Sequence, residues 1–162
     1  MSQNENNNKD RTFFKILLAI DGSDQSIKAV NYAIDTAIHQ KSNVQVIAIT
    51  VIELAKLNLS TFIAAPTYGL DDLKEKRKQA KEWLSGIEKL VKDKDKTIEF
   101  KSDIIENPTL KISSLIIDYA ENENVNLIVV GNRGKHGFKR LLLGSVASDI
   151  VTFSHCPVLV VK

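Results

Sequence analysis

The sequence has few of the features that mark secreted, membrane or nucleic-acid-binding proteins. Its single cysteine, Cys156, excludes an internal disulfide framework. No apolar run approaches the length of a membrane span and no apolar signal segment follows Met1, so no membrane association is expected. The formal net charge of +2 gives no general case for binding nucleic acid. These absences leave a soluble, cytoplasmic protein as the expectation.

The remaining bulk numbers are those of one folded domain. The chain has 162 residues, of which 43% are hydrophobic and 26% charged, as in ordinary globular proteins. This length supports one substantial core and is short for two domains. Residues 1–11 are polar and rich in asparagine, so we expect a disordered tail there and a single domain over residues 12–162.

Apolar runs and helical repeats alternate along the chain. Five short runs rich in β-branched residues predict strands at Phe13–Ile20, Val44–Val51, Thr97–Ile105, Asn126–Val130 and Val158–Val161. Apolar residues at helical spacing predict helices from about Gln25 to His39, over Leu70–Val91, after the pair Asn107-Pro108 and after Gly144. The alternation predicts an α/β fold, an open five-stranded parallel sheet with helices on both faces.

The same pattern predicts core positions and a cap for the helices, and a loop after the second strand. Ile27 and Val151 fall on the apolar stripes of the first and last helices and are expected to face the core. Ser23 or Asp24 is expected to cap the first helix. The segment from Glu53 to Tyr68 has no clear period and predicts an ordered loop of variable structure.

The last predicted strand, Val158–Val161, is apolar on both faces. As the terminal strand it is expected at an edge of the sheet, and an exposed edge invites a partner strand. A homodimer that pairs through this segment would cover it. Nearby, Cys156 is expected to be a buried, unreactive thiol, and Trp83 on the long helix is expected to be partly in the core.

A basic, glycine-rich segment follows the fourth predicted strand. Its spacing is Gly131, two residues, Gly134, nine residues, Gly144 and Ser145. Glycines let the backbone approach a phosphate closely, and the first turn of a helix offers unpaired N–H groups and a positive dipole end. Neither Gly-x-x-x-x-Gly-Lys-Ser/Thr nor a Gly-x-Gly-x-x-Gly after a strand occurs, so the segment predicts a phosphate site of a different kind.

Two further positions end strands on the same edge of the predicted sheet. Ligands of parallel α/β sheets bind beyond the carboxyl ends of the strands, so Asp21, Val51 and Gly131 are expected to converge. Simpler explanations stay open: an Asp-Gly-Ser turn, a buried valine and a flexible connection with a helix cap. Among the basic residues we select Arg133, which lies between two glycines, as ligand-facing. His136 could donate a proton or contact a phosphate, but an isolated loop histidine is more often exposed and without such a role.

Together these segments resemble the universal stress protein family. The resemblance rests on the Gly131-x2-Gly134-x9-Gly144-Ser145 pattern, on residues 16–23 and on residues 156–161, and it covers the chain from about Phe13 to Lys162. It implies a Rossmann-like fold of the adenine nucleotide alpha hydrolase type, usually dimeric through the last strand, with ATP lying across the strand ends. In that family the loop pattern marks the members that bind ATP.

Carried over to this sequence, the ATP contacts of the family fall on eight residues. The resemblance implies that Asp21 meets the ribose hydroxyls and that the backbone of Val51 recognises adenine. It also implies that the ribose and phosphates are lined by Gly131, Arg133 and Gly134, and that the phosphate tail is held by Gly144, Ser145 and Val146. Whether Mg²⁺ or Mn²⁺ accompanies the ATP is left open.

The resulting hypothesis is an ATP-binding, cytoplasmic stress-response protein that acts as a nucleotide-dependent sensor or regulator of an unidentified protein partner. One alternative is a slow ATPase or nucleotidyl-transfer enzyme, and another is a nucleotide-free interaction protein of the same fold. Phosphate chemistry needs a base or a positioned water and charge stabilisation. The candidates for those roles are scattered, so weak ATPase activity is the most that is expected.

Overall fold

The computed structural model describes residues 13–40, 43–53, 68–107, 110–134 and 143–162. Within these ranges the elements are β1 (Phe14–Ala19), α1 (Asp24–Ile38), β2 (Val44–Glu53), α3 (Tyr68–Lys94), β3 (Glu99–Asn107), α4 (Ile112–Asn122), β4 (Leu127–Gly131), α5 (Ser145–Phe153) and β5 (Val158–Val161). All five predicted strands are confirmed with small shifts of their bounds. The predicted tail at residues 1–11 lies outside the described residues.

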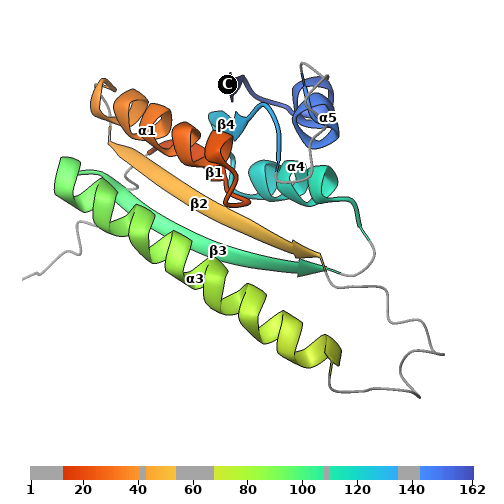
Figure 1. The fold of residues 1–162 in the computed structure, drawn as a ribbon. Helices are drawn as coiled ribbons and strands as arrows, with labels where there is room; N and C mark the ends of the chain where they lie inside the picture. Colours follow the sequence, from red (N-terminus) through yellow and green to blue (C-terminus); the bar gives the residue numbers. More distant parts are fainter. Residues whose placement is uncertain (1–12, 41–42, 54–67, 108–109, 135–142) are drawn as a thin grey trace, which may run out of the picture.

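The five strands run parallel in one sheet, in the order β3-β2-β1-β4-β5. The chain builds the sheet outward from β1 to β3 and then returns to place β4 on the other side of β1. Helices α1 and α3 cover one face, and α4 and α5 cover the other (Figure 1). The predicted fold is confirmed, and the reversal between β1 and β4 is where such sheets open a crevice at their carboxyl ends.

The central strands are buried on both faces, which explains their nearly continuous apolar runs. In β1, Ile16 packs in the core under α1 and α3, whereas Leu17 packs in the core under α4 and α5. Both side chains are 0% exposed. Val46 and Ile47 of β2 divide between the two cores in the same way, because successive side chains of a strand point to opposite faces.

Two predicted core positions are wrong. Ile27 is 52% exposed and Val151 is 48% exposed. In α1 the buried stripe begins at Ser26, whose backbone lies close to the end of β4, and Ile27 is turned about 100° away from Ser26. In α5 the buried positions are Ala147 and Ile150, and Val151 is turned about 100° away from Ile150.

The start of α4 also differs from the prediction. Asn107 is the last residue of β3, and Lys111 is the N-cap of a helix that begins at Ile112. Pro108 lies outside the described residues. Two other local predictions hold: Ser23 caps α1 by accepting a hydrogen bond from Ser26 N, and Trp83 is half-buried against the core under α1 and α3.

Strand β5 forms one edge of the sheet, as predicted. On its inner side, Pro157 O accepts from Ile128 N at 3.0 Å and Val161 O accepts from Asn132 N at 2.6 Å. Strand backbone alternates in direction, so the N–H and C=O groups of Val158 and Val160 point outward from the sheet. Cys156, just before the strand, is half-buried, and burial raises the pKa of its thiol, as expected for an unreactive cysteine.

Candidate functional site

Asp21 lies at the carboxyl end of β1, where the chain turns into α1. Its Oδ1 accepts hydrogen bonds from Ser23 N at 3.0 Å and from Ser23 Oγ at 2.6 Å. Ser23 in turn accepts from Ser26 N at 3.2 Å and so begins the helix. The simpler interpretation of Asp21 as a turn-forming residue is therefore correct for one of its two carboxylate oxygens.

The other carboxylate oxygen faces the glycine-rich loop. A Cβ built on Gly134 would fall 2.6 Å from Asp21 Oδ2, so a side chain at position 134 would collide with this carboxylate. Asp21 and Gly134 are far apart in the sequence, and the sheet brings them into contact. Asp21 is also an exposed residue, so this contact lies at the surface of the molecule.

Gly131 is required by packing at the end of β4. A Cβ there would lie 2.9 Å from the backbone carbon of Gln25 and 2.9 Å from Ser26 N, in the first turn of α1. Backbone atoms cannot move aside as a flexible side chain can. This glycine therefore lets the start of α1 approach β4, and the positive end of that helix points to the same edge of the sheet.

The two ends of the glycine-rich loop are tied together. Gly144 N donates to Asn132 O at 2.7 Å, which brings the start of α5 beside Arg133. Gly144 is the N-cap of α5 and has an ordinary extended backbone. At a helix start the N–H groups of Ser145 and Val146 have no intrahelical acceptor, so they are suited to an anion.

Arg133 lies between the Asp21 turn and the start of α5. Its Nε is buried and has no hydrogen-bond partner in the part of the chain that the structure describes. A buried donor left without an acceptor costs about 1–3 kcal/mol. The carbonyl oxygen of Arg133 accepts a hydrogen bond from Ser23 Oγ at 3.3 Å, and this bond links the loop to the Asp21 turn. A guanidinium group in this position suits a phosphate.

Val51 lies on the same edge, but β2 does not end there as predicted. The strand continues to Glu53, two residues further. Ile49 O accepts from Ile20 N at 2.9 Å, so the backbone of Ile49 faces β1. By strand alternation the N–H and C=O of Val51 face the same side, beyond the end of β1 at Ala19. The N–H and C=O of Val51 can therefore form hydrogen bonds with the edge of a planar ring in the space beyond β1.

Two polar residues of this edge were missed by the sequence reasoning. Ser23 was considered only as a helix cap, although it also contacts the Asp21 carboxylate and the Arg133 carbonyl. The hydroxyl of Thr50 is buried and has no partner among the described residues. A threonine inside the apolar run of β2 was the available signal. Residues 54–67 and 135–142, including His136, lie outside the described residues.

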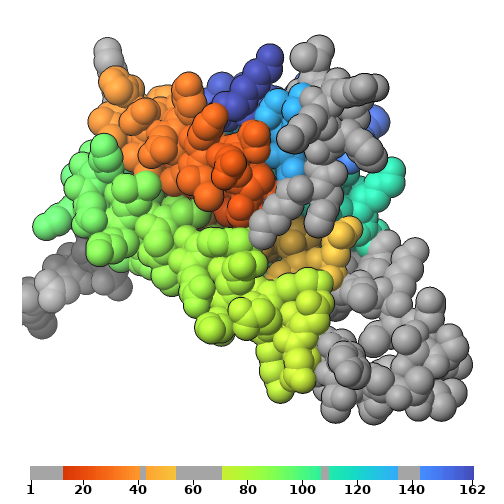
Figure 2. Space-filling model, viewed as in Figure 1, coloured from red at the N-terminus to blue at the C-terminus, as the bar shows by residue number. Residues whose placement is uncertain are grey.

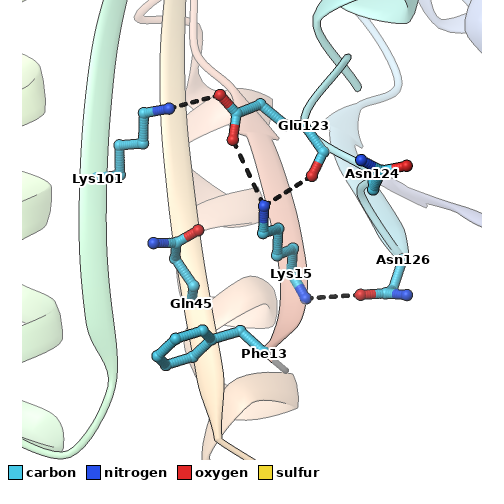
Figure 3. A pocket seen from close by; sticks show the side chains of 7 residues that line it. All are labelled: Phe13, Lys15, Gln45, Lys101, Glu123, Asn124 and Asn126. Carbon is cyan, nitrogen blue, oxygen red and sulfur yellow. Dashed lines mark hydrogen bonds and ion pairs between the residues drawn. The ribbon is translucent and has the colours of Figure 1, made fainter. Parts of the chain in front are cut away.

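A hollow opens at the opposite, amino ends of the strands (Figure 3). It has a volume of about 520 Å³ and is lined by Phe13, Lys15, Gln45, Lys101, Glu123, Asn124 and Asn126. Lys101 Nζ lies 2.6 Å from Glu123 Oε1, and Lys15 Nζ lies 2.8 Å from the Glu123 carbonyl oxygen. The hydrogen bond from Lys101 lowers the pKa of Glu123. Since both lysines bind Glu123, a residue of the protein itself, we interpret this hollow as structural.

The described part of the chain contains neither a cluster of metal ligands nor a helix suited to a membrane. Among these residues, no three His, Cys, Asp or Glu side chains are grouped as metal ligands would be. None of the described helices combines the length and the apolar character needed to span a bilayer.

Comparison with known proteins gives consistent matches over nearly the whole chain. The model of the universal stress protein family matches residues 12–162. A universal stress protein of Methanocaldococcus jannaschii is 32% identical over 157 residues, which cover 96% of this chain and 85% of that protein.

Solved structures match in the same way. Universal stress protein UspA from Lactobacillus plantarum has a TM-score of 0.79 at 22% identity, covering 93% of this chain and 99% of that chain. The universal stress protein from Archaeoglobus fulgidus in complex with dAMP has a TM-score of 0.62 at 18% identity, covering 94% and 99%. At these identities the structural matches support the fold alone.

Proposed function

Because the chain belongs to the universal stress protein family, we propose that it binds ATP at the carboxyl edge of its sheet and regulates a partner protein according to nucleotide occupancy. The observation that carries the proposal is the contact of the Asp21 carboxylate with Gly134, beside a buried Arg133 nitrogen that has no partner among the described residues. A solved relative from Archaeoglobus fulgidus holds dAMP, which supports an adenine nucleotide as the ligand.

Each end of the nucleotide has a counterpart on this edge. Asp21 accepts hydrogen bonds from the ribose hydroxyls, and the backbone groups of Val51, which face the space beyond the end of β1, pair with the adenine edge. Arg133 supplies charge to the phosphates. The phosphate tail lies against the main chain of Gly144 and the first N–H groups of α5, where a helix start favours an anion.

The glycines divide between two roles. Gly131 and Gly134 have no side chain because α1 and the Asp21 carboxylate occupy the space that one would fill. Among the described residues, the nearest atoms to a Cβ built on Gly144 are 3.5 Å away, an ordinary contact distance. Packing against those residues therefore does not require a glycine at position 144, whereas a phosphate lying against its backbone would. An accompanying Mg²⁺ or Mn²⁺ ion would arrive as part of the ATP complex.

Substitution at Gly144 tests ATP binding without a large effect on folding. We expect wild-type protein to bind ATP in titration calorimetry and Gly144→Val to lose that binding with its urea midpoint only slightly lowered. Gly86→Ala is the control, because among the described residues no atom outside its own stretch of α3 lies within 4 Å of a Cβ at this position. Mass spectrometry of the purified protein should find retained adenine nucleotide. No retained nucleotide together with no heat of binding would refute the proposal.

The regulatory part of the proposal requires that ATP favours one conformation through differential affinity. We expect saturating ATP to change hydrogen exchange in α3 or in residues 54–67, which follow β2 directly in the sequence. Unchanged exchange in both segments would contradict a sensor. ADP formation in the same samples tests the ATPase alternative: turnover well above that of Asp21→Ala and Ser145→Ala variants would favour an enzyme.

The proposed regulator is a homodimer that pairs through β5. The outward backbone groups of Val160 provide the ladder for a second copy, and the strand carries no charge or proline that would discourage it. We expect Val160→Pro to give a monomer in light scattering and Val160→Thr to stay dimeric, because only proline removes the outward N–H group. A monomeric wild-type protein would contradict this assembly.

A further inference from the structure

Trp83 of α3 lies directly on the turn that carries Asp21. A Cβ built on Gly22 would fall 2.5 Å from Trp83 Cη2, 2.7 Å from Cε2 and closer still to Cζ2. The six-membered ring of the indole therefore covers the α-carbon of Gly22. Figure 2 shows α1 and α3 packed side by side on this face of the molecule, which is how a residue on α3 reaches the turn.

The backbone of this turn is unusual at Gly22. Its φ is +74°, in the left-handed region that residues with a Cβ rarely adopt. Gly22 joins Asp21 to Ser23, and Ser23 holds Asp21 Oδ1 through two hydrogen bonds. The direction of the Asp21 carboxylate thus depends in part on the conformation of Gly22, and Gly22 lies against the indole of Trp83.

The surroundings of Trp83 make it a firm support. It is half-buried and packs against the core that α1 and α3 share above the sheet. A rigid aromatic ring packed against a glycine α-carbon excludes water and restricts the backbone beneath it. A smaller or more flexible side chain would leave space under Gly22, and the turn would be free to change its φ and move Asp21.

We propose that Trp83 is a positioning residue for nucleotide selectivity: by supporting Gly22 it holds the Asp21 carboxylate in the direction that recognises a ribose 2′,3′-diol. The inference rests on the proposed function, since it assumes that an adenine nucleotide binds at this edge. Trp83 does not contact the ligand itself. Its effect reaches the nucleotide only through Asp21, and it acts on the sugar rather than on the base or the phosphates.

Comparison of ATP with 2′,3′-dideoxy-ATP isolates this effect. Wild-type protein should bind ATP about tenfold more tightly, because hydrogen bonds to a charged carboxylate are the stronger ones. Trp83→Leu should weaken ATP binding about tenfold and leave dideoxy-ATP within about twofold, so that the preference disappears. In an Asp21→Asn background, Trp83→Leu should cause no further loss of affinity for ATP.

Leu90→Ala is the control for a merely structural role. Leu90 lies on the same helix and packs partly against the same core, but it is seven residues, or about 10 Å, further along α3. This variant should lower the urea midpoint and keep the preference for ATP. Loss of the preference in Leu90→Ala would mean that general loosening of α3 is sufficient, and it would overturn the inference.

The outcomes separate this inference from the function on which it rests. If wild-type protein binds neither nucleotide, the proposed function fails. If it binds both equally, or if Trp83→Leu weakens both equally or keeps the preference for ATP, ATP binding stands and the role of Trp83 is overturned.

Discussion

The two ends of the parallel sheet are built in different ways. At the carboxyl end, a Cβ added to Gly22, Gly131 or Gly134 would lie less than 3.0 Å from another group. These groups are the Trp83 indole, the backbone at the start of α1 and the Asp21 carboxylate, respectively. At the amino end, the long side chains of Lys15 and Lys101 reach Glu123 across open space (Figure 3). The carboxyl end is therefore closely packed around its glycines, whereas the amino end presents side chains that can rearrange.

This difference predicts how each end responds to mutation. Contacts between backbone atoms cannot relax without moving whole elements, so a single added methyl group has a large effect. Partly exposed ion pairs are screened by water and contribute little, typically about 0–1 kcal/mol. A rigid arrangement of main-chain donors and one carboxylate is also what a binding site needs before its ligand arrives.

The largest effect is expected for Gly22→Ala. The alanine must adopt a positive φ, and its methyl group must displace the indole of Trp83. Together these costs predict a loss of about 3 kcal/mol in the free energy of unfolding. Urea denaturation measures it, with Gly86→Ala as the control that should gain about 0.5–1 kcal/mol. A loss below about 1 kcal/mol would show that the carboxyl end is less closely packed than inferred.

Gly131→Ala is expected to come next, with a loss of about 2 kcal/mol. Its methyl group would press on the backbone of Gln25 and Ser26, which can move only with the whole of α1. Gly144→Ala, on the same edge, should cost less, about 0.5–1 kcal/mol, because it exchanges one N-cap residue for a poorer one without a steric clash among the described residues. Equal effects of the two substitutions in urea denaturation would contradict the division of glycines into packing and ligand-facing positions.

Ser23→Ala should cost about 1 kcal/mol, because it removes the N-cap of α1 and one hydrogen bond to Asp21. Faster hydrogen exchange should be confined to the first turn of α1. Ser23→Thr keeps the hydroxyl group and serves as the control. If Ser23→Ala were as stable as wild type, the Asp21 turn would be held by other contacts.

The smallest effect is expected at the amino end, for Glu123→Gln. The hydrogen bond from Lys101 lowers the pKa of Glu123 from its ordinary value of 4.5. A carboxylate with a lowered pKa stabilises the folded state above its ordinary pKa and loses that contribution as the pH falls through the lowered value.

Wild type should therefore exceed Glu123→Gln by up to about 1 kcal/mol at pH 7. The difference should shrink steadily below pH 4.5 as Glu123 is protonated. Urea denaturation at a series of pH values measures this, and Glu121→Gln, at an exposed position of α4, is the control. A difference that does not depend on pH would exclude the ion pair as its source.

Much of the fold was predictable because its signals are local. The β-branched runs predicted all five strands, and their strict alternation with helical repeats predicted a parallel sheet. Ile27 and Val151 were assigned to the core wrongly, because an apolar stripe defines a helix face only to within a neighbouring residue. The choice of Ser26 over Ile27 depends on how closely α1 approaches β4.

The candidate site was only partly predictable, for a related reason. The glycine spacing and the position of Asp21 after a strand predicted that the glycine-rich loop and Asp21 meet at one edge of the sheet, and the structure brings Asp21 beside Gly134. The support that Trp83 gives to Gly22 had no signal, since an amphipathic helix explains a half-buried tryptophan without any specific contact. Val51 was expected at the end of its strand, and the pairing of β2 with β3 instead continues to Glu53.

The sequence alone determined the order of elements, the parallel sheet and the edge at which the glycine-rich loop and Asp21 are found. Periodicity and turn chemistry decide these features within short stretches of chain. Only the tertiary structure decided that two of the loop glycines make room for α1 and for Asp21, and that Gly144 does not. These roles depend on close approaches between segments about a hundred residues apart, which are set by how helices pack on a twisted sheet.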